Sequence, residues 1–125
     1  MDLNFFADPG LAPKPRSEIR IEEFRLSPYP DGRRVRVEIE LTPFAPADRP
    51  SLEITAHKPD GTQAAATTII ESVQRSFGLT MHLRTPETSG EFTFQAELYY
   101  GENPPQDTVT QTIQLILGGS NEEES

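Results

Sequence analysis

The chain has 125 residues and a formal net charge of −9, with twelve prolines, eight glycines and neither cysteine nor tryptophan. The lack of cysteine excludes disulfides, thiolate zinc sites and cysteine nucleophiles, and the acidic balance argues against binding to nucleic acid or to anionic membranes. The length predicts one domain, and the many turn-forming residues indicate strands rather than helices.

The first residues, Met-Asp-Leu-Asn-Phe-Phe, lack the basic and long apolar stretches of a signal peptide. No apolar run approaches the length of a transmembrane helix. We therefore expect a cytoplasmic protein without membrane insertion, with a fragment of a secreted protein as the alternative.

Residues 1–17 are predicted to form a proline-rich extended arm, because Pro9, Pro13 and Pro15 oppose regular structure. This arm is more apolar than a solvated segment requires. Its apolar side chains either fold back over the domain or contact a partner chain. They are Leu3, Phe5, Phe6 and Leu11.

Six further segments have the composition and periodicity of strands, separated by turn signals. They are 19–26, 33–41, 51–58, 77–84, 90–100 and 108–117. In the first of these the apolar parity changes, which predicts a bulge near Glu22-Glu23 that lets the strand touch both sheets. The loop 42–50 is long enough to cross between sheets.

Residues 63–75 fit two patterns. Ala66, Ile69, Ile70 and Val73 have helical spacing, whereas the β-branched composition and the preceding Asp60-Gly61 turn favour a strand. We predict a strand, and an edge strand, because no face of it is cleanly apolar.

The clearest strand is 90–100, in which alternate residues are apolar. The inward set is Phe92, Phe94, Ala96, Leu98 and Tyr100. Such alternation over the whole segment is typical of a strand with one buried face.

The run Thr88-Ser89-Gly90-Glu91-Phe92-Thr93-Phe94, followed by a hairpin and a threonine-rich strand, resembles the closing strands of immunoglobulin-like and fibronectin type III-like domains. The resemblance implies an all-β fold, an antiparallel two-sheet immunoglobulin-like sandwich of about seven strands, over residues 18–117. From its glycines and glutamates, the segment 118–125 is predicted to be a disordered acidic tail. Phe92 stands where such domains have a corner tyrosine, and Phe94 stands where antibody domains have a cysteine.

No catalytic, metal-binding or cofactor-binding motif is recognisable. His57 and His82 have outward parity on strands expected in different sheets, so they are not predicted to share a metal. In the implied topology the loops 42–50 and 101–107 project from the same end. Phe44 and Tyr99 are therefore candidate partner contacts in one exposed aromatic patch.

We expect a non-enzymatic protein-interaction or assembly module without a cofactor, bound to another protein or to a second copy of itself. The alternative is a carbohydrate-binding or adhesion-type module from an extracellular protein.

Overall fold

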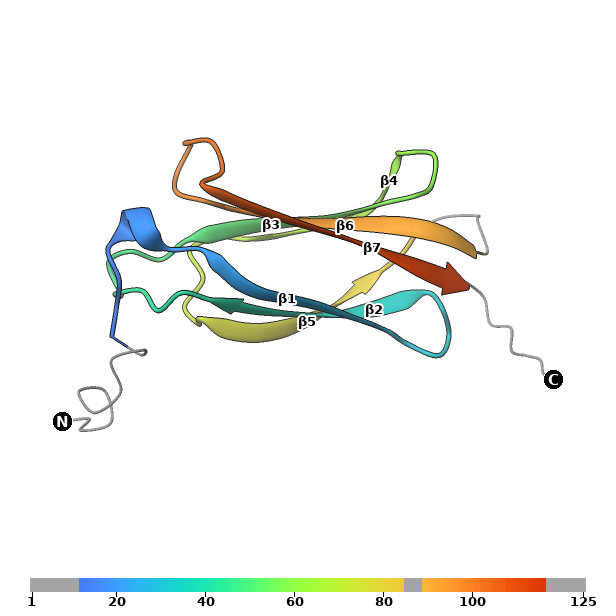
Figure 1. The fold of residues 1–125 in the computed structure, drawn as a ribbon, viewed down its shortest axis with the longest axis horizontal. Coiled ribbons are helices and arrows are strands. Elements are labelled where there is room, and N and C mark those ends of the chain that lie inside the picture. Colours follow the sequence, from blue (N-terminus) through green and yellow to red (C-terminus); the bar gives the residue numbers. More distant parts are fainter. Residues whose placement is uncertain (1–11, 85–88, 117–125) are drawn as a thin grey trace.

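The computed structural model describes residues 12–84 and 89–116, which form a sandwich of two antiparallel sheets (Figure 1). A short 3-10 turn, Arg16–Glu18, precedes seven strands. The strands are β1 (Ile21–Pro28), β2 (Arg34–Leu41), β3 (Ser51–His57), β4 (Gln63–Ile69), β5 (Ser76–His82), β6 (Ser89–Tyr99) and β7 (Asp107–Ile116). The predicted contacts Leu3, Phe5, Phe6 and Leu11 and the predicted acidic tail lie outside the described residues.

One sheet has the strand order β1-β2-β5 and the other the order β4-β3-β6-β7. The chain crosses between the sheets after β2, β4 and β5, so the loop at 42–50 is a crossing loop as predicted. In constant-type immunoglobulin sandwiches the first, second and fifth strands likewise share one sheet, and the third, sixth and seventh share the other. Here the fourth strand pairs with β3 and not with β5.

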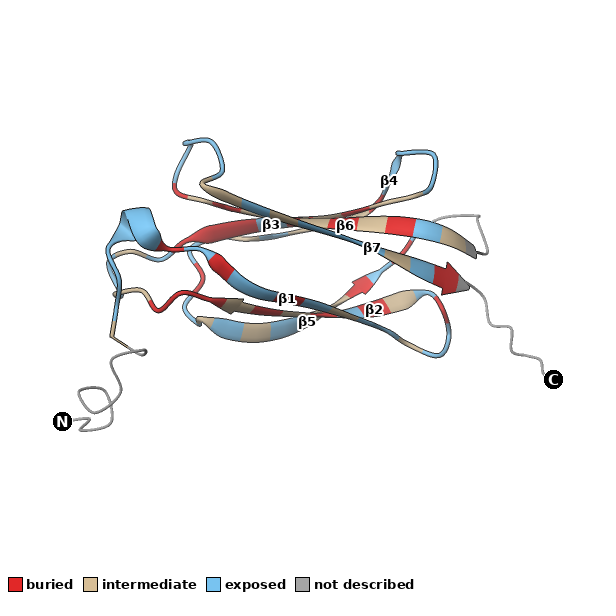
Figure 2. Cartoon of the chain, viewed as in Figure 1, coloured by how far each residue is buried: buried red, intermediate tan, exposed pale blue. Residues whose placement is uncertain are grey.

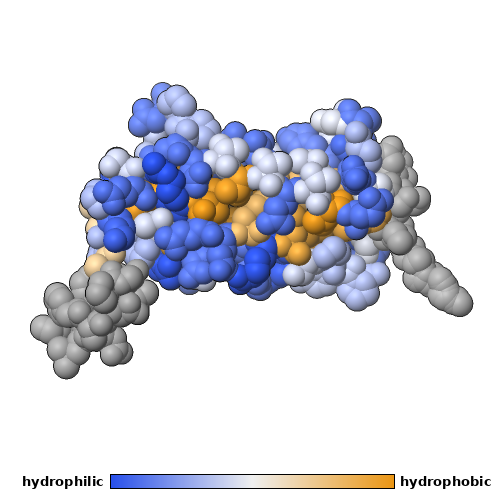
Figure 3. All heavy atoms as spheres, in the orientation of Figure 1, coloured by the Kyte–Doolittle hydropathy of each residue, from blue (hydrophilic) through white to orange (hydrophobic). Residues whose placement is uncertain are grey.

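The core lies between the two sheets and is built from apolar residues of both. Figure 2 shows buried residues recurring along the strands of each sheet. The alternation predicted for the strand at 90–100 is confirmed, because every inward residue named for it is buried. The two inner faces interdigitate and exclude water, which supplies most of the driving force for folding. Along the side where β1 and β7 lie, an apolar band remains visible at the surface (Figure 3).

The sheet edge at β4 confirms the strand prediction and corrects its length. β4 is an edge strand that ends at Ile69, before the predicted end at residue 75. Glu71 then has a φ of 50°, which extended strands do not adopt. Its neighbour Ser72 donates its N–H to Pro50 O at 2.8 Å, so the chain turns across the end of the sandwich.

The first strand has the predicted bulge, between Ile21 and Glu23. Among the described strands β1 pairs with β2 alone, and side chains link it to the other sheet. Asp107 Oδ2 accepts the Ile21 N–H at 2.8 Å, and Gln111 Nε2 donates to Phe24 O. The second bond explains why a polar residue interrupts the apolar face of β7.

Ion pairs account for charges on the outer face of the three-stranded sheet. Arg25 lies 3.2 Å from Glu38, and Arg75 lies 3.1 Å from Glu40 and 3.6 Å from Glu22. Such partly exposed pairs contribute little stability each, about 0–1 kcal/mol.

Candidate functional site

The end of the sandwich that carries the loop 42–50 contains a groove of about 470 Å³, here called the end groove. It forms where that loop, the Arg16–Glu18 turn, the 70–75 connection and the start of the β6–β7 hairpin meet. Its lining includes Arg16, Arg49, Ser51, Glu71, Tyr99 and Tyr100. These residues come from segments far apart in the sequence, and only the sandwich topology brings them together.

Tyr100 forms the inner wall of the end groove and is fixed from two sides. Its hydroxyl donates to Asp48 O at 2.8 Å. The Arg16 guanidinium lies over its ring, 4.7 Å from the centroid, and binds Asp48 Oδ1 at 3.1 Å. Burial raises the pKa of the Tyr100 phenol, an effect that Arg16 partly opposes, so the hydroxyl stays a proton donor at neutral pH.

Tyr99 and Arg49 are two groove residues with side chains that a partner could reach, and Ile70 beside them is 66% exposed. Tyr99 is half-buried on the opposite face of β6 from Tyr100, and Arg49 is exposed. Within the described part of the chain no ion pair is formed by Arg49, whereas Arg16 is neutralised by Asp48. An aromatic ring can stack on a planar or apolar group, and a guanidinium in the same groove can bind a carboxylate.

Ser51 and Glu71 lie on the same groove. Ser51 Oγ accepts the Glu71 N–H at 3.0 Å, which holds the 70–75 connection against the start of β3. The Ser51 hydroxyl proton and the Glu71 carboxylate remain as additional polar groups for a ligand.

Of the two predicted contacts on described residues, the structure places only Tyr99 in the end groove. Phe44 is partly buried against the core. Its backbone forms an isolated parallel β-bridge with Lys14, whose N–H donates to Pro43 O at 2.9 Å. The aromatic wall is therefore made by Tyr99 with Tyr100. No pattern in the sequence indicated that Arg16 or Arg49 would line this groove. Arg16 belongs to the predicted N-terminal arm.

His57 and His82 lie on β3 and β5, in different sheets, as predicted. In residues 12–84 and 89–116 no group of three or more histidines and carboxylates is arranged to hold a metal ion. The same residues contain no helix that is long and apolar enough to cross a membrane.

No protein-family model matches the chain, and no curated protein matches it. Several solved structures match the chain in fold. A β-glucuronidase from Bifidobacterium dentium, solved with coumarin-3-O-glucuronide, matches 78% of this chain with 16% identity and a TM-score of 0.59. A glycosyl hydrolase family 2 member from Bacteroides cellulosilyticus matches 78% with 12% identity and a TM-score of 0.59.

A β-glucuronidase from Parabacteroides merdae matches 78% of the chain with 8% identity and a TM-score of 0.53. The chain spans only 18%, 15% and 14% of these three proteins. At such identities the likeness is one of fold, to a segment of each enzyme, and fold alone does not carry function.

Proposed function

We propose that the chain is a non-enzymatic recognition module that holds a partner protein at the end groove. The observation that carries this proposal is that the half-buried Tyr99 lines the same groove as Arg49, which forms no ion pair among the described residues. Tyrosine and arginine are enriched where binding energy concentrates in protein interfaces. Because Tyr100, Arg16 and Asp48 fix the wall behind them, a partner meets a preorganised surface.

Charge selects the kind of partner. The chain is acidic overall, so its net charge repels an acidic partner and does not draw one to the surface at large. At the end groove Arg49 offers a local cation. We therefore expect the bound segment to present an apolar or aromatic group to Tyr99 and a carboxylate to Arg49.

The test compares retention of binding proteins from a lysate of the source organism by the natural chain, Tyr99→Ser and Arg49→Glu. We expect each variant to lower retention of a specific protein at least tenfold, because truncating a residue that dominates an interface costs about 2 kcal/mol or more, and tyrosine and arginine are enriched among such residues. Lys58→Glu makes the same charge change in the β3–β4 turn, away from the end groove, and should retain the protein fully. Retention that is equal in all three variants would contradict the proposal.

A carbohydrate-binding accessory module is the second candidate. It is supported by the fold shared with segments of β-glucuronidases and by an aromatic ring with polar groups beside it, which can stack on a sugar. The same variants separate the two candidates on a glycan array that includes uronic acids. Binding that Tyr99→Ser abolishes favours the sugar module, and an array without signal leaves the protein partner.

A further inference from the structure

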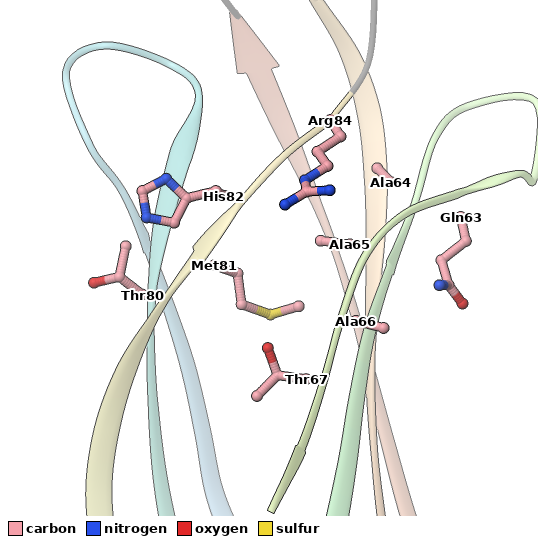
Figure 4. Close-up of a pocket in the computed structure, with 9 residues that line it drawn as sticks. All are labelled: Gln63, Ala64, Ala65, Ala66, Thr67, Thr80, Met81, His82 and Arg84. Carbon is pink, nitrogen blue, oxygen red and sulfur yellow. The ribbon is translucent and has the colours of Figure 1, made fainter.

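A second hollow, here called the side groove, runs between the edge strands β4 and β5 (Figure 4). It consists of two adjoining parts of about 510 and 530 Å³ that share Thr67. At one end Arg84, which follows β5, donates its N–H to Ala64 O of β4 at 3.0 Å. Beyond that bond the two strands diverge, each at the edge of its own sheet.

Unpaired backbone groups of β4 face this groove. Next to β3, Pro50 O accepts the Ser72 N–H. In an antiparallel pair, the backbone N–H and C=O groups of every second residue point toward the partner strand. In the β3–β4 register this places the backbone of Thr67 and its alternate neighbours toward β3. The N–H and C=O groups of Ala66 and Thr68 therefore point into the side groove, and no described residue bonds to them.

The same reasoning applies to β5. Just after β5, Leu83 donates its N–H to the O atom of Arg33, the residue before β2. In the β2–β5 register, alternate residues of β5 therefore face β2. The backbone groups of Gly78 and Thr80 consequently face the side groove from the other side. The groove is thus bordered by two strand edges, each with hydrogen-bonding groups to offer.

The side chains of β4 leave this edge open. The strand carries no charge, and Ala64, Ala65 and Ala66 are small enough to let another backbone approach. Natural sheets usually protect an edge with charged residues or proline. β1, an edge of the other sheet, has both, with Glu22, Glu23, Arg25 and Pro28.

A cation marks one end of the side groove. In Figure 4 the Arg84 guanidinium lies over the hollow, toward which Met81, Ala65 and Thr67 also point. Arg84 is exposed, and its guanidinium forms no ion pair among the described residues. A ligand with a carboxylate at that end would complement it.

We propose that the side groove binds an extended peptide segment of a partner protein, which pairs antiparallel with β4 as a fifth strand and places a carboxylate beside Arg84. Strand addition of this kind takes affinity from backbone hydrogen bonds and specificity from alternate side chains. The groove is bordered by β4 on one side and β5 on the other, and charge complementarity to Arg84 at its end favours a segment that carries a carboxylate there. The antiparallel direction puts the carboxyl-terminal end of the peptide at Arg84.

This surface is additional to the end groove, and the experiment separates the two. The probe is a fluorescent nine-residue peptide of alternating threonine and valine that ends in aspartate, with binding followed by anisotropy. Two matched peptides carry lysine in place of the aspartate, or N-methyl groups on alternate residues of the pairing edge. We expect the first peptide to bind at least tenfold more tightly than either matched peptide.

Variants locate the binding. Ala66→Pro removes an N–H from the open edge of β4, and Thr110→Pro makes the same change at β7, the other edge of that sheet. We expect a tenfold loss for Ala66→Pro and none for Thr110→Pro or for Tyr99→Ser. Arg84→Glu should reverse the preference between the aspartate and lysine peptides.

Equal binding of the N-methylated peptide, or no binding by any peptide, overturns the proposal whether or not Ala66→Pro folds. If the natural chain has twice the expected molecular mass in solution and Ala66→Pro restores the mass of one chain, a second copy occupies the edge. Binding that appears only after removal of residues 1–11 would identify the chain's own N-terminal segment as the occupant. Either of these two outcomes would overturn the proposal that the occupant is a peptide from a partner protein.

Discussion

At the scale of single residues, Tyr100 shows how one side chain joins the core to the surface. Its ring is buried, and its hydroxyl reaches the carbonyl of Asp48 in the crossing loop. Parity predicted its burial, but not the hydrogen bond, because Asp48 lies far away in the sequence. The neighbouring Tyr99 has the opposite parity and no such bond among the described residues.

We expect Tyr100→Phe to lower the free energy of unfolding by about 1 kcal/mol, because the partly buried Asp48 carbonyl loses its donor. Urea unfolding followed by circular dichroism measures the change. Tyr99→Phe removes the same hydroxyl group from the other face of β6 and should stay within about 0.5 kcal/mol of the natural chain. Equal effects of the two variants would show that the bond to Asp48 contributes nothing.

At the scale of elements, the start of β6 depends on a close approach to the β3–β4 turn. Gly90 has a φ of 140°, and a Cβ there would lie 2.7 Å from Pro59 Cγ. The turn itself is held by Asp60, which accepts the Thr62 N–H at 2.9 Å and the Thr62 hydroxyl at 2.7 Å. These bonds lower the pKa of Asp60, so the carboxylate stays ionised well below neutral pH.

Gly90→Ala should therefore destabilise the fold by about 2–3 kcal/mol, since backbone strain adds to the contact with Pro59. The melting temperature and the urea midpoint report the loss. Gly61→Ala is the matched control, because Gly61 has a φ of 92° but open space around its Cβ position. If both variants lose the same stability, the contact with Pro59 is not what requires glycine at position 90.

At the scale of the whole molecule, the two sheets share one core, so they should fold and unfold together. Ile39 on β2 and Ile54 on β3 lie in different sheets and are both buried. A single apolar layer joins them, and neither sheet can bury its inner face alone.

We expect Ile39→Val and Ile54→Val each to lower the free energy of unfolding by about 0.5–1.5 kcal/mol within one cooperative transition. Tyrosine fluorescence and far-ultraviolet circular dichroism should give coincident urea curves for both variants. A second transition in either variant, or curves that separate between the two probes, would show that the sheets unfold independently.

The sequence by itself determined the strands, because alternation of apolar residues reports which face of a strand is buried without reference to its neighbours. Gly90 to Tyr100, the bulge of the first strand and the crossing loop at 42–50 were all readable in this way. The function had no such local pattern. The non-enzymatic character and the protein partner stay proposals, as do the contacts expected at Leu3, Phe5, Phe6 and Leu11.

The tertiary structure alone decided which distant residues meet. Arg16, Arg49 and Tyr99 line one groove because the strands that precede and follow their loops end at the same side of the sandwich. The end of β4 at Ile69 was set by bonds to Pro50 and Ser51, and not by local propensity. The open edges that border the side groove exist because β4 joins β3 and β5 joins β2, and strand pairing is a long-range choice that no local pattern encodes.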